Sequence, residues 1–267
     1  MTIAGVTASK FKEYAMYSVE RFTDDLKKLI RKNLAIYCHG ADLAENGGVM
    51  FEYKSTVNHF LDVYDSKSEK IKKGLIGELL VHIVIGAYMP EFEPISPYFN
   101  LEERSIRKGF DLLLYDHGNK DVWITEVKSG EQRTGKDHDQ TAKTLLADAR
   151  DDLAGRISSN ELNHWRNAIH AVRSAVSGEK DYKDVVVSLL QGDGEKVISK
   201  SLRSVEKPVV LVAVLFHTLS QRLSEEVISE FSEDLRQRAL FKSAISISVQ
   251  KETIGKVVDF LRSESEG

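Results

Sequence analysis

The chain has 267 residues, of which 42% are hydrophobic and 29% are charged, so it can bury a sizeable core like an ordinary globular protein. Its formal net charge of −4 excludes a basic chain that wraps nucleic acid along its whole length. Any nucleic-acid contact must therefore come from a local cluster of Lys and Arg. The single cysteine, Cys38, excludes an intramolecular disulfide and a zinc site built from several cysteines.

The same features predict where the protein works. One cysteine fits a reducing cytoplasm, and the first residues lack the basic and apolar segments of a signal peptide. The longest apolar runs, residues 79–85 and 209–216, are too short to span a bilayer. We therefore expect a cytoplasmic protein without a membrane segment.

The first part of the chain contains one clear helix candidate. Residues 22–37 place apolar side chains near the 3.6-residue period of a helix. Residues 50–53 suit a short strand, and residues 65–73 form a polar separator. We therefore divide the chain into an N-terminal elaboration, residues 1–73, and a main domain, residues 74–267. Helix 22–37 could dock a partner protein, or it could pack on the sheet as one more core helix.

Residues 74–89 are the strongest helix candidate, because they are continuously apolar apart from Glu78 and His82. Prolines at positions 90, 94 and 97 end this helix. Two strand candidates follow at residues 110–115 and 122–128. The polar turn between them, residues 116–120, suits an antiparallel hairpin.

The second half of the chain alternates helices and strands. We expect helices at residues 139–153, 161–176, 181–190, 224–240 and 253–261, with a turn at residues 192–194. Residues 209–216 are rich in β-branched side chains and predict a buried strand, and residues 243–249 alternate like a strand. This order predicts an α/β fold, with a mixed central sheet flanked by helices.

Ionisable side chains interrupt both strands of the predicted hairpin. Side chains alternate between the faces of a strand, so Glu126 and Lys128 emerge on the same face. Asp111 stands among apolar neighbours on the other strand. An uncompensated buried charge costs several kcal/mol. These groups therefore either pair with one another or serve a site that needs them.

If the two strands pair, Asp111 comes beside Glu126 and Lys128. Two carboxylates so close repel each other unless a cation lies between them, and Mg²⁺ prefers oxygen ligands of this kind. A lysine can orient a metal-bound water or help to deprotonate it, and the metal offsets charge that develops on a phosphate. The constellation suits hydrolysis of a phosphodiester bond.

The motif formed by Gly109-Phe110-Asp111 and, after 14 residues, Glu126-Val127-Lys128 resembles the PD-(D/E)xK nuclease superfamily. That superfamily places the first acid on one strand and the acid-x-lysine on the next, within a restriction-endonuclease-like core. Phe110 stands where the superfamily usually has proline. The resemblance implies a DNA endonuclease that uses Mg²⁺, for which Mn²⁺ can substitute.

The resemblance also implies a role for each matching residue. Asp111 and Glu126 would be metal ligands, together with the carbonyl of Val127. Lys128 would be the base that positions water, and Glu78 in the preceding helix would be an auxiliary catalytic acid and ligand.

A closer resemblance is to the nuclease subunit of Hachiman antiphage defence systems. It covers roughly residues 74–216 and rests on the apolar helix with Gly77-Glu78, the two hairpin motifs and the later strand that begins at Pro208. It implies the effector subunit of a bacterial defence complex, regulated by a helicase-like partner.

Cationic side chains flank the two strands, where the phosphate backbone of DNA would approach. They are Arg104, Arg107, Lys108, Arg133, Lys136 and Lys143.

Two other interpretations stay open. The chain could be a catalytically silent domain of the same fold that binds nucleic acid or protein, or a structural module whose acids only pair with Lys128. Glu78 could also pair with His82, one helical turn further on.

Overall fold

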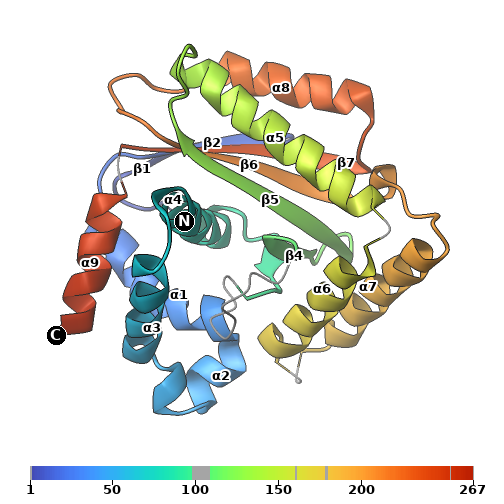
Figure 1. Cartoon of the computed structure of the whole chain (residues 1–267), viewed down its shortest axis with the longest axis horizontal. Coiled ribbons are helices and arrows are strands. Elements are labelled where there is room, and N and C mark those ends of the chain that lie inside the picture. Colours follow the sequence, from blue (N-terminus) through green and yellow to red (C-terminus); the bar gives the residue numbers. More distant parts are fainter. Residues whose placement is uncertain (1, 98–108, 160, 178–179, 253, 267) are drawn as a thin grey trace.

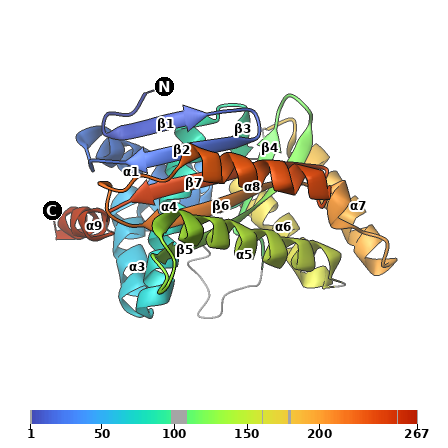
Figure 2. The same ribbon diagram turned by 90° about the horizontal axis from the view of Figure 1, so that it is seen from above.

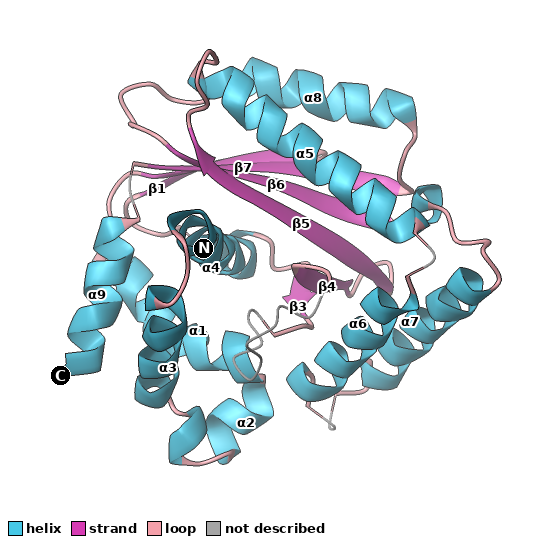
Figure 3. Ribbon diagram, viewed as in Figure 1, coloured by secondary structure: helices cyan, strands magenta, loops and turns pink. Residues whose placement is uncertain are grey.

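A computed structural model describes residues 2–97, 109–159, 161–177, 180–252 and 254–266. A seven-stranded mixed sheet lies at its centre, in the order β1-β2-β7-β6-β5-β4-β3, with helices on both faces (Figures 1 and 3). The structure confirms the predicted α/β class with a mixed sheet flanked by helices.

Both parallel and antiparallel pairs occur in the sheet. The neighbours β2-β7, β7-β6 and β6-β5 are parallel, and the outer pairs are antiparallel. Figure 2 shows β1, β2, β7, β6 and β5 following one another across the molecule. The strands are β1 (Val6–Lys10), β2 (Tyr14–Val19), β3 (Phe92–Pro94), β4 (Leu112–Asp116), β5 (Asp121–Glu131), β6 (Pro208–Phe216) and β7 (Ser243–Lys251).

The helices form a layer on each side of the sheet, each with its own apolar core. The first layer holds α1 (Asp24–His39), α3 (Tyr53–Asp65), α4 (Glu69–Tyr88) and α9 (Gly255–Glu266), and α2 (Ala41–Asn46) and the 3₁₀ turn η1 (Val49–Phe51) follow α1. The second layer holds α5 (His138–Ser158), α6 (Leu162–Ala175), α7 (Lys183–Ile198) and α8 (Glu225–Arg238), and the 3₁₀ turn η2 (Ser204–Glu206) precedes β6.

Burial explains the most apolar segments. Every residue of β6 is buried, as expected for a central strand with parallel neighbours. Helix α4 lies between the sheet and the helices α1 and α3, so it is apolar on nearly all sides. No helix within the described ranges is long and apolar enough to cross a membrane.

The predicted β4–β5 hairpin is confirmed, with Leu112 opposite Thr125 at one end and Asp116 opposite Asp121 at the turn. Strand β5 is much longer than β4. From Glu126 to Glu131, β6 is its only ladder partner among the described residues. In the described part of the chain, the carboxyl end of β5 therefore has an edge without a strand partner, called the open edge below, beside the start of β4.

Three predictions about local structure are wrong. Residues 50–53 are no strand, because they belong to η1 and to the start of α3. The polar stretch 65–73 is no separator, because α4 already begins at Glu69. Residues 192–194 lie inside α7, where core contacts of Leu190 and Val197 outweigh the low helix propensity of glycine.

The N-terminal segment is part of the main sheet and core. Strand β2 pairs with β7, although β1 and β2 were not predicted. Leu26, Ile30 and Leu34 of α1 lie in the same apolar core as α4. Helix α1 is thus a core helix that packs over α4, and the boundary between residues 73 and 74 falls within α4.

Candidate active site

Strand β5 carries Glu126 into the layer of α5. Val122 and Ile124 point into the apolar core on this face, and Glu126 follows in the same alternation, only 1% exposed. The guanidinium of Arg156 in α5 donates from Nη1 to Oε2 over 2.7 Å and from Nη2 to Oε1 over 3.1 Å. This two-point contact is the strong form of a carboxylate pair, and it fixes the orientation of Glu126.

Lys128 lies one step further along the same face. Its Nζ donates to Oε1 of Glu126 over 2.8 Å and to Oδ2 of Asp152 over 2.7 Å. Burial opposes the charge, but attraction to Glu126 and the hydrogen bonds to Asp152 and Glu126 outweigh it and raise the pKa of Lys128. Lys128 is therefore an ammonium group at neutral pH, and in that form it can donate hydrogen bonds but cannot accept a proton.

The sequence predicts that Asp111 lies within a strand, but in the structure it lies immediately before β4. Its Oδ2 accepts a hydrogen bond of 2.8 Å from the backbone N–H of Val127, at the open edge of β5. The N–H and C=O of one strand residue point to the same side, so the Val127 carbonyl faces this edge too. Burial, followed by repulsion from Glu126, raises the pKa of Asp111 from 3.8 to about 7.

Glu78 approaches the same point from α4. Its pKa is raised well above the ordinary value, first by burial and then by repulsion from Asp111 and Glu126. Three carboxylates from three segments of the chain therefore lie within electrostatic range of one another. Lys128 only partly offsets this repulsion.

The charge state of His82 bears on its alternative pairing with Glu78. His82 is 1% exposed, and burial lowers its pKa to about 3, so its ring is neutral at neutral pH. The ring lies 5.0 Å from that of Tyr37, centroid to centroid. His82 is a core residue of α4.

Two residues of the cluster were not predicted from the sequence. Asp152 and Arg156 lie one turn apart on α5 and contact Lys128 and Glu126. Their spacing of four residues is a weak signal for a shared helix face, common on any solvated helix. Only the packing of α5 on β5 assigns them to the site.

The predicted DNA-binding cations do not all lie at the cluster. Arg133 contacts Oδ2 of Asp148 at 2.5 Å, and Lys136 donates to Thr144 Oγ1 over 2.7 Å, both at the amino-terminal half of α5. Lys143 is directed toward α8, with Nζ 3.6 Å from Glu230 Oε2. Arg104, Arg107 and Lys108 lie outside the described residues.

The donor atoms suit a hard divalent cation. Mg²⁺ in proteins commonly takes one or two carboxylates, and water and phosphate oxygens complete its shell. Asp111, Glu126 and the Val127 carbonyl are oxygen donors at one edge, and the repulsion that raises the pKa of Asp111 is what such a cation would relieve. In the described part of the chain, no group of three His, Cys, Asp or Glu side chains is arranged to hold a metal ion. The argument that this site can hold a divalent cation therefore rests on two carboxylates, those of Asp111 and Glu126, and on the Val127 carbonyl.

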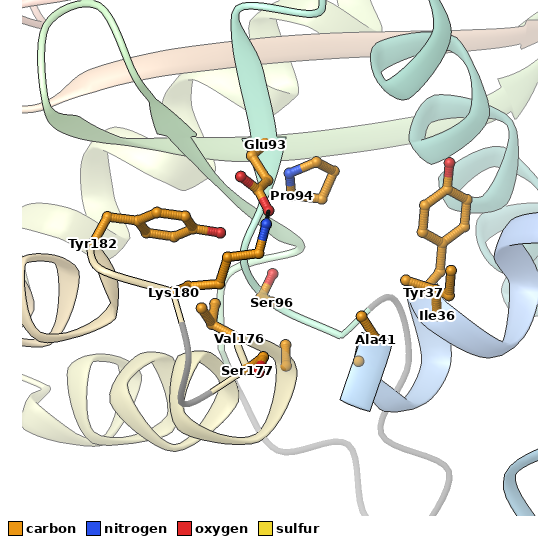
Figure 4. Close-up of a pocket in the computed structure, with 12 residues that line it drawn as sticks. Ile36, Tyr37, Ala41, Glu93, Pro94, Ser96, Val176, Ser177, Lys180 and Tyr182 are labelled. Atoms are coloured by element: carbon orange, nitrogen blue, oxygen red, sulfur yellow. Dashed lines mark ion pairs between the residues drawn. The ribbon is translucent and has the colours of Figure 1, made fainter. Parts of the chain in front are cut away.

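A separate pocket of about 160 Å³ lies between α1, β3 and the segment before α7 (Figure 4). Lys180 and Tyr182 point toward Glu93 in this pocket, and His117 Nε2 lies 2.8 Å from Glu93 Oε2. Burial opposes the charge of Glu93, but these partners outweigh it and lower its pKa. Because cationic and hydrogen-bonding partners already surround the Glu93 carboxylate, we interpret this cluster as a structural contact between β3 and the α6–α7 connection.

Comparison with known proteins identifies the family. The profile of the HamA family matches residues 9–262, which include both hairpin motifs, Glu78 and the α5 residues of the cluster. No curated protein matches the chain. The family agrees with the resemblance to a Hachiman subunit, and the match covers far more than half of the sequence. The chain therefore belongs to the HamA family of Hachiman antiphage defence components.

Proposed function

We propose that this chain is a Mg²⁺-dependent DNA endonuclease and the effector subunit of a Hachiman defence complex. The observation that carries the proposal is the proximity of Asp111, which lies at the edge of β5, to Glu126 and Lys128 on the face of the same strand. Two acids and an ammonium group at one point suit phosphodiester hydrolysis. The motif of the PD-(D/E)xK superfamily supports the same reaction.

Each residue has a task in this proposal. Asp111, Glu126 and the Val127 carbonyl would hold the metal, with Glu78 beside them. The bound metal would supply a Lewis acid and activate water. Lys128, as an ammonium group, orients the attacking water or a phosphate oxygen by donating a hydrogen bond. Arg156 holds the Glu126 carboxylate in place through two hydrogen bonds.

The cleavage of plasmid DNA tests this function, with Mg²⁺ or Mn²⁺ and with or without the helicase-like subunit. We expect Lys128→Ala and Glu126→Gln to abolish cleavage. Each removes one charge from a buried cluster and costs about 1–3 kcal/mol of stability, so circular dichroism should still show a folded chain. If either variant cleaves as fast as the native chain, the site assignment is wrong.

Lys207 offers a matched control. It forms another buried ion pair, with Nζ 2.6 Å from Asp193 Oδ2, between α7 and the start of β6. Lys207→Ala should cost similar stability and leave cleavage unchanged. Loss of cleavage in this control would mean that the assay reports folding and not catalysis.

One observation favours the silent binding module as a second candidate. The oxygens of Glu126 accept three hydrogen bonds, two from Arg156 and one from Lys128, so the ion-pair network is closed without a metal. A native complex that binds DNA but cleaves none with either metal would support this alternative.

A further inference from the structure

A groove of about 370 Å³ opens beside the candidate active site, between α4 and α5 and over the end of β5. Three cationic residues and one anionic residue line it, in a chain whose net charge is −4. The lining residues are Lys70, Lys73, Ser129, Gly130, Glu131, Arg133 and Leu145.

The close packing of α4 on β5 sets the positions of two of the cations, Lys70 and Lys73. A Cβ atom at Gly77 would lie 1.9 Å from Oγ of Ser129, so the helix reaches this distance only because residue 77 is glycine. Lys73 and Lys70 precede Gly77 by about one and two helical turns on the same face. They therefore extend from the crossing point over the open end of β5.

Helix α5 forms the opposite wall and connects the groove to the acidic cluster. Leu145 lines the groove, Asp148 contacts Arg133, and Asp152 contacts Lys128. These positions recur every three or four residues, so they share one face of the helix. Leu145 and Asp152 are separated by about 10 Å along the axis, roughly the rise of three nucleotides of one strand.

We propose that this groove binds the phosphate backbone of one DNA strand next to the bond to be cleaved, with Lys70 and Lys73 as anchors on one wall and Arg133 on the other. The choice of DNA as ligand rests on the proposed function. Lys73 forms an ion pair of 2.8 Å with Glu131, but these side chains are 25% and 60% exposed. Solvated pairs of this kind are weak, so a phosphate can replace Glu131.

Fluorescence anisotropy of a labelled oligonucleotide tests the proposal in the full chain. The Lys128→Ala background without metal prevents cleavage, so only binding is measured. Lys70→Gln with Lys73→Gln should weaken binding about tenfold and reduce the slope of log K against log salt by about two. Glu131→Gln should have the opposite effect and tighten binding, because it removes the anion of the groove and frees Lys73.

Lys28→Gln with Lys32→Gln is the matched control, since both residues are exposed on α1 outside the groove. Thermal melting of every variant checks folding, and Arg133→Gln tests the other wall independently. The proposal is overturned if the groove variants bind like the control, or if the chain binds neither single- nor double-stranded DNA at low salt. Binding that depends on the groove in a native chain that never cleaves DNA would contradict the proposed activity and leave the groove assignment standing.

Discussion

At the scale of single residues, Asp111 links the stability of the folded protein to pH. Burial and the nearby Glu126 raise its pKa from 3.8 to about 7, so its charged form is disfavoured in the folded state. An acid whose pKa is raised on folding lowers stability once pH exceeds its unfolded pKa, and this cost grows until pH passes the folded value. Ionised Asp111 should therefore destabilise the metal-free protein most above pH 7.

We predict that Asp111→Asn raises the melting temperature, and that the gain grows between about pH 4 and pH 7. The full effect is on the order of a few kcal/mol, since one pKa unit corresponds to about 1.4 kcal/mol. Asp65→Asn is the control, because that side chain is half exposed and pairs with Arg262 at the surface. A gain that does not change with pH would refute the interpretation of Asp111.

Melting temperatures measured with Mn²⁺ test whether Asp111 holds a metal ion. A cation held by Asp111 favours its charged form, so Mn²⁺ should stabilise the native chain at high pH and remove the advantage of Asp111→Asn. At about one hundred times its dissociation constant, a ligand of the folded state adds about 2.7 kcal/mol. Equal shifts in the native and variant proteins would place the metal elsewhere.

At the scale of elements, the distance between α4 and β5 depends on one glycine. We predict that Gly77→Ala destabilises the protein by about 1–3 kcal/mol through overpacking. At an exposed helical glycine, the same substitution would raise the free energy of unfolding by up to about 1 kcal/mol. The sign of the change therefore shows whether residue 77 is tightly packed. The expected clash is with Ser129, whose Oγ and Cβ would lie 1.9 and 2.9 Å from the new Cβ.

Urea unfolding measures this effect. Gly155→Ala in α5 is the control, because its Cβ position faces open space, with nothing within 4 Å beyond the neighbouring backbone of its own helix, and the substitution should be neutral or stabilising. Adding Ser129→Gly to Gly77→Ala should recover part of the lost stability. If Gly77→Ala is as stable as the control, α4 can move away from β5 at little cost.

Local patterns were sufficient to predict the β4–β5 hairpin and the side of β5 that carries Glu126 and Lys128. Alternation sets the face of a strand, and a polar turn joins neighbouring strands, so both features depend on nearby residues. The same holds for α4 and β6, whose apolar runs are long. Strands β1 and β2 were missed because β2 owes its place to pairing with β7, more than 200 residues away.

For the candidate active site too, local patterns predict only the contacts between residues that are close in sequence. Asp111 could be placed near Glu126 because one hairpin joins them. Arg156 contacts Glu126 across 30 residues and between two layers, and no local pattern specifies that contact. The resemblance implies that Lys128 is a base, but in the structure the carboxylates of Glu126 and Asp152 hold it as an ammonium group. Sequence motifs identify the residue types, and the packing of α5 supplies the partners of Glu126 and Lys128.

At the scale of the whole molecule, the N-terminal segment cannot be separated from the rest. Strand β2 pairs with β7, and α1 and α3 cover α4, so a chain that begins near Ser68 would expose the core of one layer. Loss of a partner by such a shortened chain would therefore not distinguish docking from unfolding. The proposed docking of a helicase-like subunit is therefore better tested by surface substitutions in the folded protein.

Residues 1–73 offer one suitable surface. Val49 and Met50 in η1 are 72% and 76% exposed, and Leu43 of the neighbouring α2 is 37% exposed. Single exposed apolar residues are common, but adjacent ones suit the centre of a protein interface, where a few side chains dominate the affinity. If the proposed helicase-like subunit docks here, Val49→Ser with Met50→Ser should weaken its retention at least tenfold.

Co-purification of the two subunits measures this retention, and Ile198→Ser is the matched control, because Ile198 is 69% exposed at the end of α7. Substitutions at such exposed positions change stability by only about 0.5 kcal/mol, so both proteins should melt like the native chain. Full retention by the η1 variant would exclude this surface as the centre of the interface. Equal losses in the variant and the control would show that retention depends on general surface hydrophobicity and not on η1.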